Sequence, residues 1–511
     1  MATEFKQDDI RLEAVPSNQD LKGQDLALQR LTPEEESRLV EIKRKIDLRM
    51  LFIVLMYIMN RKPLILMSLA HTHPKRARPF QYAVRAPEGL PMTDSQYSTC
   101  ISILYVGYIF AQIPSNFLLN WCGRPSLYLP LWMAAWGIVS ACIGLVQSFT
   151  GAVMCRFVLG FVEAPLFPGA LFVLSKWYTK TELAKRVTML WMANFISNSL
   201  NGLISAGILA GTNGKLGHAG WRWLFWIDGA MTVFVAIVCV FFVPDFPHND
   251  RWLSVEDREL VQKRITLETG EADEDDDMPF KKVALSCILD VKVWAFVLSL
   301  FGQLVAQSFQ QFFPSIVATL GYNSTITLLL TAPPWVFAGL VAYCNAYVSD
   351  VRQRRFEHLA APYVLAIVGF VMAATTKATA PRYIAMFFMT CANAGYLLNF
   401  PWIAATFPRP PAKRAGIIAV ANCLGNLGTV AGSYIFPTAW GPSYANSSAI
   451  LGVSAAFGIV ILALLRWYLV RLNRKMDEAA AESHLAVEAQ QALGVSGVQI
   501  EGNAVAWRYQ I

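Results

Sequence analysis

Long apolar runs are the feature that most constrains how this chain can fold. Twelve runs, each close to the roughly 20 residues that cross a bilayer core, alternate with polar connections. They lie near residues 50–69, 97–120, 127–147, 152–174, 187–210, 223–243, 291–319, 327–348, 359–376, 382–406, 415–436 and 448–470. Lipid offers the backbone no hydrogen-bonding partners, so runs of this length predict helices. We therefore expect an all-α membrane protein.

The order of the runs predicts two halves. Six runs precede and six follow a polar segment that contains the acidic stretch EADEDDD. The expected units are a cytoplasmic N-terminal segment (1–48), a six-helix bundle (49–243), a cytoplasmic linker loop (244–290), a second six-helix bundle (291–471) and a cytoplasmic tail (472–511). Only 15% of the residues are charged, against about 25% in soluble domains, which argues against a soluble enzyme.

The distribution of Lys and Arg predicts the orientation. Basic residues are concentrated in alternate loops, and such loops face the cytoplasm. Residues 1–48 have no apolar core of the kind that a signal peptide needs, so both termini are expected inside. The sequons at Asn323 and Asn446 then fall in outer loops and are candidate glycosylation sites. We expect a multi-pass protein of the plasma membrane.

The start of the first helix also has a local signature. In the stretch TPEEESRLVEIKRKIDLRM, Thr32 is the expected cap and Pro33 the expected first helical residue. Glu35 stands at the position that completes a capping box. The sequence therefore predicts a capped helix that begins on the cytoplasmic side.

Two loops repeat between the halves. NFLLNWCGRP (116–125) matches AYVSDVRQRR (346–355), and Ala-Lys-Arg precedes a span at 184–186 and again at 412–414. The loops resemble the G-x-x-x-D-x-x-G-R-R signature of the major facilitator superfamily, with Asn in place of the acid in the first copy. The resemblance implies gating roles for Asn120, Gly123, Arg124, Asp350, Arg354 and Arg355.

Longer stretches resemble the anion:cation symporter family in its fungal allantoate permease branch. They include RFVLGFVEAPLFPG (156–169), GWRWLFWIDG (220–229) and AWRY (506–509). The resemblance implies twelve transmembrane helices in two six-helix bundles, with proton-coupled uptake of a small organic anion by alternating access. Allantoate, ureidosuccinate, nicotinate and vitamin-like carboxylates are the implied cargoes. A monomer in the lipid bilayer is expected, with no cofactor, metal or nucleic acid.

One region departs from that family. Its members carry an Asp-Arg pair soon after a Tyr and an Asn of the first span. Here Tyr57 and Asn60 are followed by Arg61, Lys62 and Pro63, and residues 61–91 form a basic loop on the expected outer side. Natural divergence is one interpretation. A retained intron or shifted splice site, which we prefer, would leave a short first span and put transport by this literal sequence in doubt.

Glu163 is the clearest chemical candidate within the spans. A carboxylate at the centre of a membrane helix costs about 2.5–3.5 kcal/mol, and low dielectric favours its protonated form. We predict that Glu163 carries the coupling proton, the alternative being a neutral packing role. Gly160 and Pro165 are expected to thin or bend its helix, and Arg156, two turns away, to extend toward the membrane interface.

Amide side chains recur at helical spacing in four other spans. Their periodicity places them on single helix faces. The predicted substrate contacts are Gln303, Gln307, Gln310, Asn194, Asn198, Asn393, Tyr396 and Asn399. The alternative is that such residues hold helices together, each contributing about 0.6 kcal/mol.

Other function classes find little support. The six histidines lie outside the predicted spans, and no zinc-protease motif, nucleophile elbow or phosphate loop is present, which argues against an enzyme. No CxxC pair suggests a metal site. A nutrient sensor of the same fold and an exporter of a small metabolite remain as alternatives.

Overall fold

The computed structural model describes residues 32–60, 92–178, 180–212, 214–269, 285, 287–352, 354–407, 411–441 and 443–492. The stretch 61–91, on which the splice-site interpretation rests, lies outside the described residues. So does the acidic run at 271–277.

The first half consists of helices from α2 to α9. They are α2 (Pro33–Asn60), α4 (Asp94–Cys122), α5 (Pro125–Ile143), α6 (Phe149–Glu163), α7 (Leu166–Trp177), α8 (Lys180–Thr212), the short η1 (Lys215–Gly217) and α9 (Gly220–Phe242). Helix α10 (Val255–Thr269) follows in the segment between the halves.

The second half repeats the pattern with more interruptions. Its helices are α12 (Val291–Gln307), α13 (Phe309–Ala318), α14 (Ser324–Arg352), α15 (Arg355–Thr375), α16 (Thr379–Thr390), α17 (Ala392–Tyr396), α18 (Asn399–Thr406), α19 (Pro411–Gly425), α20 (Leu427–Gly432), η3 (Thr438–Trp440) and α21 (Ala445–Ala492).

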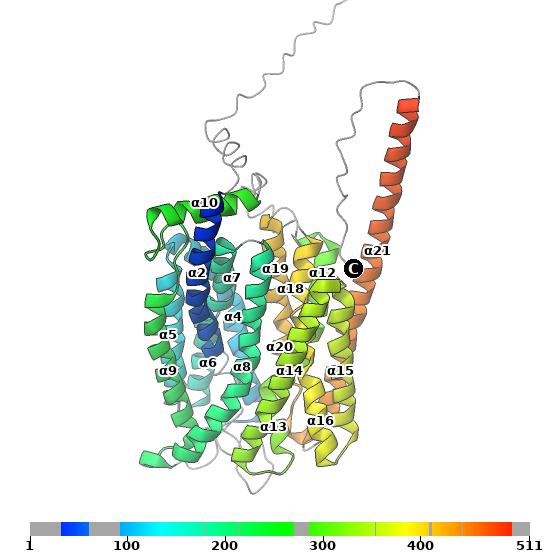
Figure 1. The fold of residues 1–511 in the computed structure, drawn as a ribbon. Coiled ribbons are helices and arrows are strands. Elements are labelled where there is room, and N and C mark those ends of the chain that lie inside the picture. The colour runs from blue at the N-terminus through cyan, green and yellow to red at the C-terminus, as the bar shows by residue number, and fades with distance from the viewer. Residues whose placement is uncertain are drawn as a thin grey trace, which may run out of the picture.

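The helices form two bundles that stand side by side (Figure 1). Within the described residues, each predicted span coincides with one helix or with consecutive helix segments, and the first span can be followed only to Asn60. In this part of the chain, seven helical stretches are long and apolar enough to cross a membrane. Each bundle has its own core, with Trp136 and Leu159 buried in the first and Trp335 and Trp402 buried in the second. The predicted fold class, twelve transmembrane helices in two six-helix bundles, is confirmed.

Helix α10 lies across one end of the first bundle, over the start of α2 (Figure 1). Ion pairs attach it there: Arg38 contacts Glu256 and Asp257, and Lys263 contacts Glu35. We call this side of the molecule the α10 end and the opposite side the far end.

The predicted capping box of α2 is confirmed at the α10 end. The Glu35 amide donates to Thr32 Oγ1 at 3.2 Å, and the Thr32 amide donates to Glu35 Oε2 at 2.8 Å.

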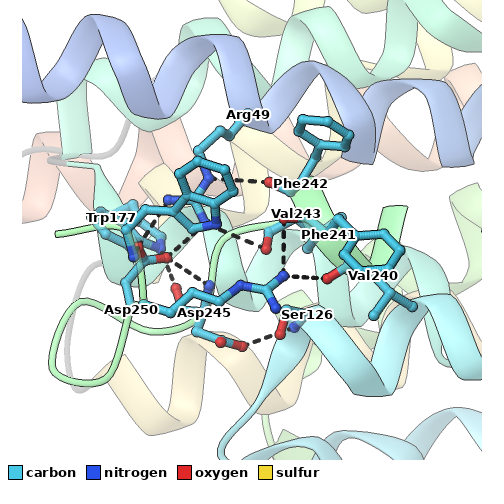
Figure 2. A network of polar contacts seen from close by, with 11 residues as sticks. Arg49, Ser126, Trp177, Val240, Phe241, Phe242, Val243, Asp245 and Asp250 are labelled. Carbon is cyan, nitrogen blue, oxygen red and sulfur yellow. Dashed lines mark hydrogen bonds and ion pairs between the residues drawn. The ribbon is translucent and has the colours of Figure 1, made fainter. Parts of the chain in front are cut away.

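A buried polar network joins several helix ends at the α10 end (Figure 2). The Arg49 guanidinium of α2 donates to both oxygens of Asp250, each at 2.9 Å, and to the carbonyl of Phe242 at the end of α9. Asp245 accepts the Ser126 amide of α5 at 3.0 Å through its carboxylate, and Trp177 of α7 donates to its carbonyl. The chain after α9 therefore ties α2, α5 and α7 together.

Four membrane-crossing paths are interrupted. The breaks fall between α6 and α7, between α12 and α13, on either side of α17, and between α19 and α20. Pro165 accounts for the first break because it has no amide to donate to the preceding turn. In membranes, irregular backbone is tolerated where it is buried in protein or lines a cavity.

Candidate functional site

A polar cavity of about 120 Å³ lies where the interrupted helices of the two bundles meet. Its polar lining consists of one carboxylate, amides, phenols and one threonine hydroxyl. The members are Glu163, Asn60, Asn194, Asn198, Gln307, Gln310, Gln311, Asn393, Asn422, Asn426, Tyr57, Tyr105, Tyr108, Tyr396 and Thr429. Polar groups that converge on one cavity can orient a small solute through hydrogen bonds.

Glu163 is the last residue of α6, immediately before the break, and is only 7% exposed. Gly160, one turn earlier, allows α4 to approach closely. A Cβ atom at Gly160 would lie 1.9 Å from the Leu104 carbonyl oxygen. Glycine thus lets α4 pack against the helix that carries the carboxylate.

Arg156 does not extend to the membrane interface, as the sequence led us to expect. It is 1% exposed and interacts electrostatically with Tyr97, Tyr105 and Glu163. The expectation was wrong because α6 packs with this face against α4, so that the guanidinium is enclosed between helices. The side of α6 that carries Glu163 therefore carries a buried cation as well.

The second bundle supplies a wall of linked amides. Gln307 Nε2 donates to the Tyr363 hydroxyl at 2.7 Å, and Gln310 Nε2 donates to Gln307 Oε1 at 3.1 Å and to Asn393 Oδ1 at 2.9 Å. These bonds fix the side chains before any solute binds. A pre-oriented wall reduces the entropy that binding would otherwise cost.

Gln303 and Asn399, two of the predicted substrate contacts, lie outside the cavity lining. Both are fully buried and hydrogen bond to each other: Asn399 Nδ2 donates to Gln303 Oε1 at 2.7 Å, and Gln303 Nε2 donates to Ser299 Oγ at 2.9 Å. Their amide groups are satisfied within the second bundle, so we assign them to packing.

The first bundle contributes Asn194 and Asn198 on successive turns of α8. Asn198 Nδ2 donates to Asn194 Oδ1 at 3.2 Å. The predicted substrate contacts that do line the cavity are Asn194, Asn198, Gln307, Gln310, Asn393 and Tyr396. The sequence did not single out Tyr105, Tyr108, Phe167 or Trp191, which also line it, because aromatic rings suit lipid and a packed interior equally well.

Polar contacts join the two bundles on the far side of the cavity. The Gln311 amide of α13 donates to the Tyr105 hydroxyl of α4 at 3.0 Å. Closer to the far end, the hydroxyl of Tyr434 contacts Thr99 Oγ1 at 3.1 Å and Ser102 Oγ at 3.3 Å.

The predicted gating loops lie at the α10 end, each within one bundle. Arg355 Nη1 lies 2.5 Å from Asp350 Oδ1 and 3.1 Å from Ser349 Oγ, and Arg354 lies 3.6 Å from Glu357. In the first copy, Gly123 ends α4 with a φ of 65° and Arg124 precedes α5. The side chain of Asn120 lies outside the described residues.

The two sequons lie at the far end. Asn323 precedes α14 and its Oδ1 accepts the Ile326 amide at 2.8 Å, while Asn446 is exposed in the first turn of α21. Among the described residues, no cluster of three His, Cys, Asp or Glu side chains could hold a metal ion.

Comparison with known proteins gives one family throughout. The sequence profile of the Major Facilitator Superfamily matches residues 50–433. The MFS-type transporter cnsO of Penicillium expansum is 29% identical over 450 residues, which cover 85% of this chain and 84% of that protein. A putative tartrate transporter of Agrobacterium vitis is 31% identical over 399 residues, covering 76% of this chain and 86% of that protein.

Solved structures agree on the fold. The proton:xylose symporter XylE of the major facilitator superfamily, bound to 6-bromo-6-deoxy-D-glucose, has a TM-score of 0.66 at 19% identity, covering 84% of this chain and 96% of that one. A bacterial homologue of the human lysosomal transporter Spinster has a TM-score of 0.62 at 15% identity, with coverages of 82% and 96%. At these identities the likeness concerns the fold alone.

Proposed function

Since this chain belongs to the major facilitator superfamily, and is thus a multi-pass membrane transporter rather than an enzyme, we propose that it takes up a small organic anion together with protons. The observation that carries the proposal is a single carboxylate, Glu163, in a cavity whose other polar groups are neutral, with the buried Arg156 on the same helix. We place the chain in the allantoate permease branch of the anion:cation symporters.

The charges of the site support an acidic cargo. Arg156 places a buried positive charge on α6, the helix that brings Glu163 to the cavity, and a positive potential near the cavity favours an anion over a cation. The neutral amides of Gln307, Gln310 and Asn393 suit hydroxyl, amide or ureido groups elsewhere on the same solute. The similarity to a putative tartrate transporter fits a cargo with carboxylate and hydroxyl groups.

The orientation in the proposal places the α10 end in the cytoplasm. Basic side chains such as Lys43, Arg49 and Arg186 gather there, and such residues favour the inner side. Asn323 and Asn446 then face outward, where glycosylation takes place. Both termini are inside, and the protein acts as a monomer in the plasma membrane because its two bundles already enclose the cavity.

Coupling follows from the energetics of the cargo. Uptake of an anion against a potential that is negative inside is uphill by about 2.3 kcal/mol per charge per 100 mV. One proton carried with the anion cancels that charge, and a second lets the potential assist. Glu163 is the group proposed to take up a proton from outside and release it inside.

The test is the substitution Glu163→Gln, which mimics the protonated state. In proteoliposomes loaded with unlabelled tartrate, we expect the variant to exchange labelled tartrate at a rate near that of the parent. It should fail to accumulate tartrate when an inward proton gradient is imposed. Nicotinate and allantoate are assayed in the same way.

Asp228→Asn is the matched control, because Asp228 is a buried acid within α9 of the same bundle and does not line the cavity. This variant should accumulate substrate like the parent. If Glu163→Gln also accumulates with the parental pH profile, Glu163 is structural. Binding without exchange in the parent would instead identify a sensor.

A further inference from the structure

Four aromatic rings from both bundles pack together beside the cavity. They are Phe167 of α7, Trp191 of α8, Tyr396 of α17 and Phe400 of α18, and we call them the aromatic floor. Trp191 stacks on Phe400 with centroids 6.1 Å apart and ring planes 21° apart, and it meets Tyr396 edge-on at 5.5 Å. Phe167 lies 5.4 Å from Trp191 and 6.5 Å from Phe400.

The aromatic floor lies on the α10 side of the polar lining. Along α8, Trp191 precedes Asn194 and Asn198 by one and two turns, and α8 starts at the α10 end. Phe167 follows Glu163 toward that end, and Phe400 follows Asn393. Phe167, Trp191 and Tyr396 also line the cavity itself, so a solute leaving toward the α10 end must pass these rings.

The supports of the four rings differ. Trp191 stands on α8, which is continuous over 33 residues. Phe167 stands at the start of α7, a 12-residue segment that follows the break at Pro165. Phe400 stands on α18, an eight-residue segment that follows the interruption after Tyr396. Two short segments thus bring their rings against one continuous helix.

We propose that Trp191 is the immobile part of a cytoplasmic gate. Phe167, Tyr396 and Phe400 close the exit by packing against its ring. Contacts between Trp191 and the second bundle exist only while the exit is shut, so they stabilise that state over the open one. Helix breaks let α7 and α18 move with little disturbance of the far halves of their spans. The inference rests on transport and on the proposed orientation, and needs neither an anionic cargo nor proton coupling.

Closure by aromatic packing determines how the gate responds to salt. Ring stacking is driven by dispersion and burial, so the gate should respond weakly to ionic strength. A gate held by the loop charges of Asp350 and Arg355 would loosen at high salt.

The experiment measures access to the cavity from each side. Asn198→Cys serves as the reporter in sealed vesicles of defined orientation, with a membrane-impermeant maleimide added outside. The chain without the reporter gives the background from its nine free cysteines. Adding Trp191→Ala should speed labelling from the cytoplasmic face about tenfold, since it removes three ring pairs within the aromatic floor and a fourth with Tyr57 of α2. Trp191→Phe should stay within about twofold of the parent.

The matched control is Trp132→Ala, which removes ring contacts with Tyr128 and Phe161 inside the first bundle only. Its labelling rate should match that of the parent. If a folded Trp191→Ala protein is labelled from both faces at the parental rate, the gate assignment is wrong. It is also wrong if Trp132→Ala accelerates labelling equally. Acceleration from the external face alone would overturn the orientation. If Trp191→Ala is not recovered as a folded protein, Phe400→Leu decides by the same criteria.

Discussion

Asp250 and Arg49 form a charge pair whose loss should destabilise the first bundle strongly. The Asp250 side chain is completely buried and that of Arg49 is 12% exposed. Asn in place of Asp250 keeps the shape but leaves the guanidinium without its counter-charge. Breaking a buried pair in this way costs about 3–5 kcal/mol. For a cooperative unit the size of one bundle, that corresponds to a fall in melting temperature of roughly 6–20 °C.

The assay is thermal unfolding of the purified protein in detergent, followed by tryptophan fluorescence. Trp177 and Trp252 report locally, because Trp177 donates to Asp245 and the Arg49 guanidinium lies 5.5 Å from the Trp252 ring. Arg49→Lys should give an intermediate loss, since an ammonium keeps the charge but cannot bind both oxygens as a planar fork.

The matched control is Glu41→Gln, which breaks the ion pair with Lys45 on the exposed surface of α2, where the two side chains are 68% and 66% exposed. We expect no measurable shift from it. The Asp250→Asn loss should persist in high salt, because buried pairs are screened little. A melting temperature for Asp250→Asn within about a degree of the parent would show that water reaches this pair.

Two further predictions concern the start of α8 and the contact between α4 and α6. Burial raises the pKa of Glu182, but hydrogen bonds and charges from Lys43 and Arg264 outweigh it and hold the pKa at about 2. Because folding lowers the pKa of this carboxyl from its ordinary 4.5 to about 2, the ionised Glu182 stabilises the folded protein. This stability is fully present above pH 4.5 and is lost as the pH falls through about 2. The difference in melting temperature between the parent and Glu182→Gln should therefore be constant from pH 7 to 5 and shrink toward pH 2. Glu182 attaches α10 through its ion pair with Arg264, and a difference that disappears by pH 5 would contradict this attachment. Gly160→Ala should sharply reduce the yield of folded protein in size-exclusion chromatography, because its Cβ would meet the Leu104 carbonyl at 1.9 Å, whereas Gly207→Ala, with nothing within 4 Å, should leave the yield unchanged.

Much of the fold was predictable because lipid imposes a simple rule. Runs of about 20 apolar residues must form helices, and the twelve predicted spans coincide with helical segments wherever the structure describes them, the first as far as Asn60. The cavity was partly predictable for the same reason: amides such as Asn194 and Gln307 are costly in lipid, so their helical spacing indicated an inward face.

The remainder depended on contacts between helices distant in sequence. Gln303 and Gln307 look alike in the sequence, yet Gln303 is satisfied by Asn399, 96 positions away, while Gln307 lines the cavity. Arg156 was misplaced because only the packing of α4 on α6 shows which side of α6 is enclosed. Trp191 gave no signal, since an aromatic ring suits lipid and a packed interior equally well.

The length of α2 has a mechanical consequence. Its 28 residues form one rod of about 42 Å at 1.5 Å per residue, which starts at the capping box beside α10 and ends at Tyr57 and Asn60 in the cavity wall. A rigid rod transmits a tilt from one end to the other. A probe attached just ahead of Thr32 would therefore respond to solute entering the cavity. Conversely, a partner that displaced α10 would shift Tyr57 and Asn60 in the cavity wall.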